Sequence, residues 1–122
     1  MKKVLLLCFL LSSCAITPSH WNNTQVIKIT DIHQDAVSIN CSGDIAPPLS
    51  KLLNDLDWLH QYDSYVGTTD IDNMVMIERN TVSEFQAEVN ANKSNSVYCQ
   101  LKKTLVLQQT NIISHTIQGS LK

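Results

Sequence analysis

The sequence predicts an α+β fold: a small antiparallel sheet of about four or five strands, one Leu-rich helix packed on it, and one disulfide. Three observations lead to this prediction. Short β-branched segments recur along the chain, one Leu-periodic segment follows two prolines, and twelve residues near the C-terminus alternate in polarity. A chain of 122 residues, 43% of them hydrophobic, has room for a single domain of this kind.

The first two predicted strands are residues 26–30 and 36–41, which are rich in valine and isoleucine. Residues 31–35 would form the turn between them. In the second strand, Val37, Ile39 and Cys41 share a face by period-2 alternation, so the side chain of Cys41 is expected to point inward.

The clearest helix covers residues 48–60. It starts at Pro47-Pro48, where proline is tolerated in a first helical turn, and it then repeats leucine every three or four residues. Five leucines form the stripe expected to dock on the sheet: Leu49, Leu52, Leu53, Leu56 and Leu59.

Trp58 falls on the opposite side of this helix from the leucine stripe. With Tyr62 and Tyr65 it forms a candidate partner-binding surface, since tryptophan and tyrosine are typical interface anchors. The alternative is that the helix ends near Asp57 and Trp58 folds back into the core.

The rest of the chain predicts a loop at residues 63–72, a strand at 73–78 and a short helix at 81–89. A loop at 90–96 then leads into a long strand at 97–108, with Cys99 on its inner face, and a last strand at 112–117.

The N-terminus carries a secretory signal: Lys2 and Lys3 precede an apolar run at residues 4–11. The following Leu11-Ser12-Ser13-Cys14 resembles the lipobox of bacterial lipoproteins. That resemblance implies that the thiol of Cys14 receives a diacylglyceryl group, that Cys14 becomes the first mature residue, and that acyl chains such as palmitate anchor it in a membrane. An ordinary cleavable signal is the alternative.

The predicted organisation is therefore a signal peptide at residues 1–13, a lipidated tether at 14–23 and one globular periplasmic domain at 24–122. Because Ala15 stands where an Asp retains such lipoproteins in the inner membrane, the resemblance implies the outer membrane, with the domain facing the periplasm. Trp21 in the tether either sits at the lipid headgroups or packs on the domain.

Cys8 leaves with the signal and Cys14 is consumed by lipidation, which leaves Cys41 and Cys99. In an oxidising periplasm these two thiols are expected to form a disulfide, worth roughly 4 kcal/mol in the chain-entropy model. A metal site or a reactive thiol is the alternative, but neither residue has ligand-spaced partners.

No catalytic motif is present, and the four histidines are widely scattered. We therefore expect no enzyme activity, no cofactor and no metal. Asp70, Asp72 and Asn73 lie close together, but they lack the spacing of a calcium loop. A net charge of −2 without a basic cluster argues against nucleic acid as a partner. An enzyme assembled from dispersed His and Asp residues is a third, weaker hypothesis.

The predicted order of strand, Cys-Gly-containing loop, helix and strand, followed by Val97-Tyr98-Cys99, is faintly similar to the Rcs stress-sensor lipoprotein of the outer membrane. Pilotins, which carry secretin subunits to that membrane, are similar in architecture. These resemblances imply a non-enzymatic lipoprotein that binds a protein partner as an assembly, sensor or accessory factor. The alternative is an inhibitor or exclusion lipoprotein, which would present a rigid exposed loop, such as residues 63–72.

Overall fold

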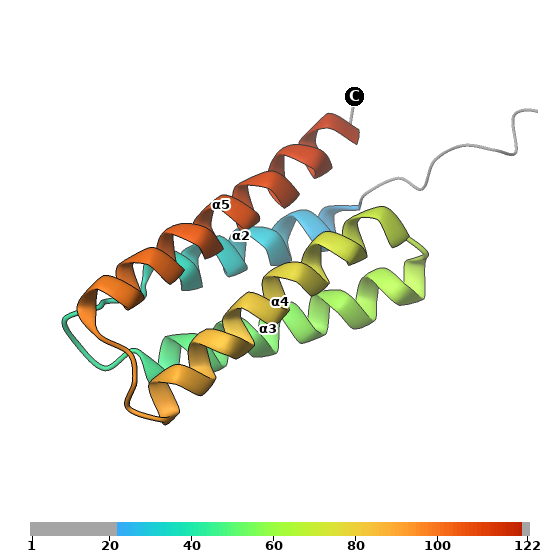
Figure 1. Cartoon of the computed structure of the whole chain (residues 1–122). Helices are drawn as coiled ribbons and strands as arrows, with labels where there is room; N and C mark the ends of the chain where they lie inside the picture. The colour runs from blue at the N-terminus through green and yellow to red at the C-terminus, as the bar shows by residue number, and fades with distance from the viewer. Residues whose placement is uncertain (1–21, 121–122) are drawn as a thin grey trace, which may run out of the picture.

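A computed structural model describes residues 22–120, and these residues form four α-helices (Figure 1). The helices are α2 (Asn23–Val37), α3 (Ala46–Val66), α4 (Thr69–Asn90) and α5 (Ser96–Ser120). Each helix runs antiparallel to the next in the chain, and α5 returns to lie beside α2, which closes an up-and-down bundle.

The predicted α+β fold is wrong, because the described residues contain no strand. The predicted strands at 26–30 and 36–41 belong to α2 and the loop after it, and the intervening "turn" is helical. The strand at 73–78 and the short helix at 81–89 are parts of the single helix α4. The predicted strands at 97–108 and 112–117 are parts of α5.

The helical spacing of the buried residues explains why these segments fold as helices. In α2 the buried residues Gln25, Ile29, Ile32 and Ala36 recur every three or four positions, as one face of a helix requires. The same spacing holds in α4 and α5, in the two sets Ile71, Val75, Glu78, Val82 and Phe85, and Val106, Thr110, Ile113 and Ile117. The predicted leucine helix is confirmed but longer, because it extends to Val66.

The helix ends carry recognisable caps. Asn22 begins α2 with a capping box, in which its side chain accepts from the backbone N–H of Gln25 and the Gln25 side chain accepts from the backbone N–H of Asn22. Gly67 ends α3 with φ +81°, a left-handed conformation that glycine adopts without strain. The side chain of Asn95 accepts from the backbone N–H of Tyr98 at the start of α5.

The predicted disulfide between Cys41 and Cys99 is confirmed, with a Cα–Cα distance of 5.7 Å. It joins the loop between α2 and α3 to the first turns of α5. Cys41 therefore lies in a loop rather than on the predicted strand, while Cys99 is fully buried, as expected.

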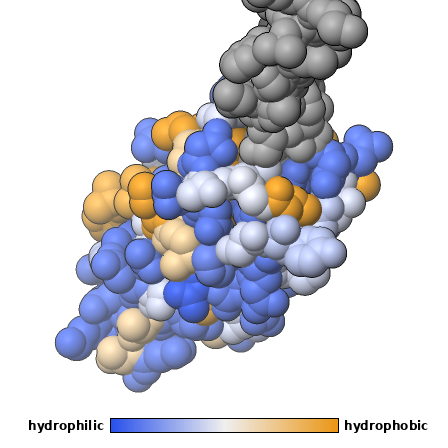
Figure 2. Space-filling model, turned by 90° about the vertical axis from the view of Figure 1, so that its right-hand side faces the viewer, coloured by the Kyte–Doolittle hydropathy of each residue, from blue (hydrophilic) through white to orange (hydrophobic). Residues whose placement is uncertain are grey.

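None of the helices in the part of the chain that the structure describes combines the length and apolar character needed to cross a membrane. The face of the molecule shown in Figure 2 is largely hydrophilic, with hydrophobic side chains gathered in separate patches.

Candidate functional site

The three predicted surface aromatics lie on α3, near its C-terminal end. The helix does not end near Asp57, so the alternative in which Trp58 folds back into the core is wrong. The side chain of Trp58 is 41% exposed and that of Tyr65 is 89% exposed. At 100° per residue, Trp58, Tyr62 and Tyr65 fall within about 60° of one another, so they share one face of α3, which we call the aromatic face.

Two of these aromatics are held in place by neighbours. The rings of Trp58 and Tyr62 stack with centroids 5.1 Å apart, and the Lys28 ammonium lies 4.8 Å from the Trp58 ring centroid. Asn22 Nδ2 donates to the Tyr62 hydroxyl at 2.7 Å. Tyr65 is the most exposed of the three, so it is the group on this face most available to a partner.

Ion pairs join α2 and α3 beside the aromatic face. Lys51 Nζ lies 2.6 Å from a carboxylate oxygen of Asp35 and 3.4 Å from one of Asp55, and Lys28 also pairs with Asp55 at 3.4 Å. Burial raises the pKa of Asp35, and Lys51 only partly offsets it. Burial acts in the same direction on Asp55, but hydrogen bonding to Asp35 and the two lysines lower the pKa of Asp55 overall.

A buried polar cluster lies where α3 turns into α4. Gln25 Nε2 donates to Asp63 Oδ1 at 2.8 Å and to the Thr68 hydroxyl at 3.1 Å. Burial raises the pKa of Asp63 to about 6, and the Asp72 charge adds to the rise. Hydrogen bonds from Gln25 and Thr68 and the nearby His60 act in the opposite direction.

The same end of the bundle also brings a histidine close to two acids. His60 Nδ1 lies 2.7 Å from Asp72 Oδ1, and the charges of both residues act on Asp63. The enzyme hypothesis requires such a group to line a pocket. His60, Asp72 and Asp63 are not among the residues that line the two hollows described below.

A second buried polar cluster lies between α4 and α5. The carboxyl of Glu78 contacts the Thr110 hydroxyl, which also lies 2.9 Å from the Val106 carbonyl. Glu78 Oε2 has no hydrogen-bond partner within residues 22–120. Burial raises the pKa of Glu78 to about 7, against a lowering by the Thr110 hydrogen bond. Beside it, Gln109 Nε2 donates to Thr81 Oγ1 at 2.9 Å.

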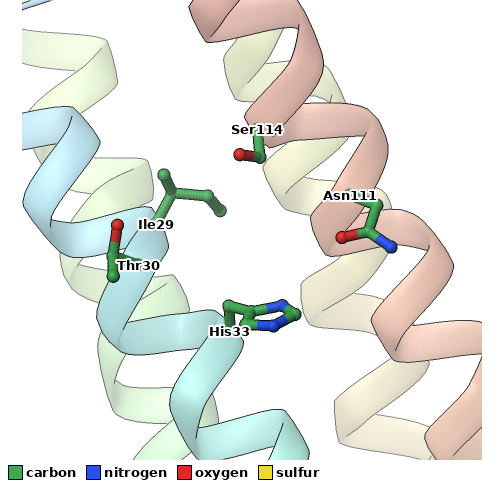
Figure 3. A pocket seen from close by; sticks show the side chains of 5 residues that line it. All are labelled: Ile29, Thr30, His33, Asn111 and Ser114. Atoms are coloured by element: carbon green, nitrogen blue, oxygen red, sulfur yellow. The ribbon is translucent and has the colours of Figure 1, made fainter.

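In the part of the chain that the structure describes, two small hollows lie beside α5. One, of about 180 Å³, lies between α2 and α5 (Figure 3) and is lined by Ile29, Thr30, His33, Asn111 and Ser114. In Figure 3 the imidazole of His33 points from α2 toward α5. The other, of about 230 Å³, lies between α4 and α5 and is lined by Met74, Ile77, Gln109 and Ile112. Both are small for a ligand pocket.

Asp70 and Asp72, which the sequence places in the predicted loop at 63–72, lie in the first turn of α4. Within residues 22–120, no group of three His, Cys, Asp or Glu side chains is placed to hold a metal ion. The predicted loop at 63–72 is also wrong, because only Gly67 and Thr68 lie between α3 and α4. Residues 63–72 therefore do not form the exposed loop suggested for the inhibitor or exclusion alternative.

Sequence reasoning missed the two buried carboxylates, Asp63 and Glu78, and an exposed apolar stripe along α5. The stripe has a signal in the sequence: Val97, Leu101 and Leu105 are spaced by four residues, which places them on one helical face. The prediction had grouped all three with Cys99 on the inner face of a strand, whereas they are exposed and Cys99 is buried.

Comparison of the chain with protein-family models, curated proteins and solved structures found no match. The order of strands and helix behind the similarity to the Rcs stress-sensor lipoprotein is not found in the described residues, which are helical. Cys14, the lipobox and Trp21 lie outside those residues.

Proposed function

We propose that this chain is a small, non-enzymatic envelope lipoprotein that binds a protein partner as an assembly, sensor or accessory factor. Lipidation of Cys14 anchors it to the outer membrane, and the helical bundle acts in the periplasm. The proposal includes no cofactor, metal or nucleic acid.

The use of the four cysteines supports a periplasmic location for the bundle. Once Cys8 is removed with the signal and Cys14 is lipidated, the remaining two cysteines are those that lie bonded in the bundle. Such a disulfide persists in an oxidising compartment such as the periplasm.

The observation that carries the binding proposal is the exposure of Tyr65, 89%, on the same face of α3 as Trp58 and Tyr62. An aromatic side chain offers a large contact area with few rotatable bonds, so little entropy is lost when a partner covers it. The ring stack of Trp58 on Tyr62 and the Lys28 contact hold the neighbouring surface in place before binding.

The anchor is tested with Cys14→Ser in cells fed labelled palmitate. We expect the native chain to take up label and to fractionate with the outer membrane, and the variant to do neither. If the Cys14→Ser variant took up label, or if it still fractionated with the outer membrane while unlabelled, lipidation at Cys14 would be contradicted.

The binding surface is tested by cross-linking and pull-down from envelopes with Tyr65→Ser and Trp58→Ala. Loss of an aromatic anchor typically weakens binding by about tenfold or more, so the captured partner should fall by that factor. Ile27→Ser is the matched control, because Ile27 is an exposed apolar residue on α2 outside the aromatic face. Equal capture by all three variants would remove the aromatic face from the proposal.

A further inference from the structure

The outward side of α5 is apolar along most of its length. Four of its side chains, Val97, Leu101, Leu105 and Ile112, are between 39% and 79% exposed. At 100° per residue they fall within about 80° of one another, on the side opposite the buried residues of the same helix. We call these four residues the α5 stripe. A helix in a monomeric bundle normally presents polar residues on this side.

The outward side of α5 also carries no formal charge. Between Ser96 and Ser120 the charged residues are Lys102 and Lys103, and both turn toward the bundle. Lys103 Nζ donates to the carbonyls of Val37 and Ile39, while Lys102 pairs with Glu84 and lies over the Tyr98 ring. Exposed polar side chains adjoin these residues: Gln100, Thr104 and Asn111 lie to one side of the stripe, and Gln108 and His115 lie within its angular range.

Identical charged surfaces repel one another, whereas an identical pair of uncharged apolar surfaces meets no such cost. This surface can therefore meet a second copy of itself without charge repulsion.

The apolar area continues from α5 onto α4. Ile112 lines the hollow of about 230 Å³ together with Met74 and the exposed Ile77. The α5 stripe and Ile77 together present on the order of 500 Å² of apolar side chain. With the flanking amides this approaches the roughly 800 Å² per partner that a stable interface buries.

We propose that the α5 stripe pairs with the α5 stripe of a second copy of this chain, in an antiparallel, two-fold symmetric contact. Residues 97 and 112 lie equally far from the midpoint between residues 104 and 105, and so do residues 101 and 108. A two-fold axis at that midpoint places Val97 of one copy opposite Ile112 of the other, and Leu101 opposite Gln108. Two-fold dimers are the commonest symmetric assemblies, and antiparallel helices also align their dipoles favourably.

The test is oxidative cross-linking of the full chain in membranes, with Leu105→Cys beside the predicted axis. We expect a disulfide-linked product of twice the chain mass. Ile27→Cys on α2, which is similarly exposed, should give at least about tenfold less. Equal yields from the two variants, or a product containing a different protein, would overturn the proposal.

A charge-reversal rescue then tests the antiparallel register. Adding Leu101→Glu to Leu105→Cys should lower the dimer yield by about tenfold, because it places a charge in an apolar contact. Adding Gln108→Lys as well should restore it, because each glutamate then faces a lysine of the other copy. Circular dichroism checks that each variant folds, as exposed positions allow. Unchanged cross-linking with Leu101→Glu, or no rescue by the lysine, would overturn the arrangement.

Discussion

Asp63 and Glu78 are both fully buried carboxylic acids of the bundle, but their surroundings supply different hydrogen-bond donors. Asp63 receives a hydrogen bond from an amide nitrogen, Gln25 Nε2, whose proton is always available to the carboxylate. Glu78 contacts a hydroxyl, that of Thr110, which carries one proton and has a second acceptor in the Val106 carbonyl.

The single proton of the Thr110 hydroxyl limits the hydrogen bonds that Glu78 and the Val106 carbonyl can make at the same time. When the Thr110 hydroxyl donates to the Val106 carbonyl, the contact with Glu78 requires a protonated carboxyl that donates in turn. When Glu78 ionises, the hydroxyl must turn to it and the carbonyl loses that bond. Burial raises the pKa of both groups, from 4.5 to about 7 for Glu78 and from 3.8 to about 6 for Asp63. Ionised and buried, either group destabilises the folded state.

Among the variants considered, removal of the disulfide should change the unfolding free energy most. The variant with Cys41→Ser and Cys99→Ser should lose about 4 kcal/mol of unfolding free energy, since the bond closes a loop across 58 positions. The bond holds α5, which supplies the Thr110 contact to Glu78, whereas the Asp63 cluster lies on α2, α3 and the Gly67 turn. Opening of α5 should therefore weaken the pH dependence caused by Glu78 more than that caused by Asp63.

Urea unfolding at pH 6 and pH 8 measures both effects. Dithiothreitol should lower the midpoint of the native chain and leave the double-serine variant unchanged. An unaltered midpoint in the variant would contradict a stabilising role for the bond.

Glu78→Gln should have the next largest effect. The folded-state pKa of about 7 lies above the ordinary 4.5, so the folded state binds more protons than the unfolded state between these values. Stability therefore falls as the pH rises from about 4.5 to above 7, and the neutral amide removes this loss. At pH 8 the variant should be more stable than the native chain by about 3 kcal/mol, and near pH 4.5 the two should be similar.

The measurement is urea unfolding across this pH range. Glu84→Gln is the control, because Glu84 is exposed and pairs with Lys102 on the surface. A pH profile of Glu78→Gln that parallels that of the native chain would show that Glu78 ionises freely in the fold.

These polar core residues also explain why the fold was predicted wrongly. Gln25, Glu78 and Thr110 occupy buried positions in the helical repeat, so a search for apolar residues at that spacing breaks at each of them. In α5 the apolar residues lie on two opposite sides, with Cys99 inward and Val97 and Leu101 outward, and this imitates the alternation of a strand. The leucine helix was predicted correctly because its stripe is wholly apolar and two prolines mark its start.

The candidate surface was predictable to a similar degree. The disulfide followed from the cysteine count, and helical spacing places Trp58 and Tyr62 on one side. Tyr65 joins them because α3 continues to Val66, through residues that the sequence predicted as a loop. The buried carboxylates could not be predicted, because a glutamate in a helix is normally solvated, and its burial depends on which helix packs over it.

Asp63→Asn should have a smaller effect than Glu78→Gln. The asparagine carbonyl can still accept from Gln25 Nε2. Its amide nitrogen, however, replaces the buried Oδ2 of Asp63, which has no hydrogen-bond partner within residues 22–120, so the variant buries a donor without an acceptor. We expect a gain of about 2 kcal/mol or less at pH 8. The pH-dependent loss that disappears should be complete just above pH 6, about one unit below the corresponding point for Glu78, because stability here falls as the pH rises from 3.8 to about 6. Asp70→Asn, at an exposed position, is the control, and identical profiles for the two variants would contradict the burial effect.

Replacement of an exposed carboxylate should change the unfolding free energy least. Asp57 on α3 pairs with Arg79 on α4, but both side chains are about one third exposed, so water can replace the partner. Asp57→Asn should change the unfolding free energy by no more than about 0.5 kcal/mol. Because salt screens exposed charges, 1 M NaCl should abolish even this difference while leaving the effect of Glu78→Gln in place. A loss of 2 kcal/mol or more for Asp57→Asn would mean that the pair is shielded from water, and would place Asp57 with the two buried acids.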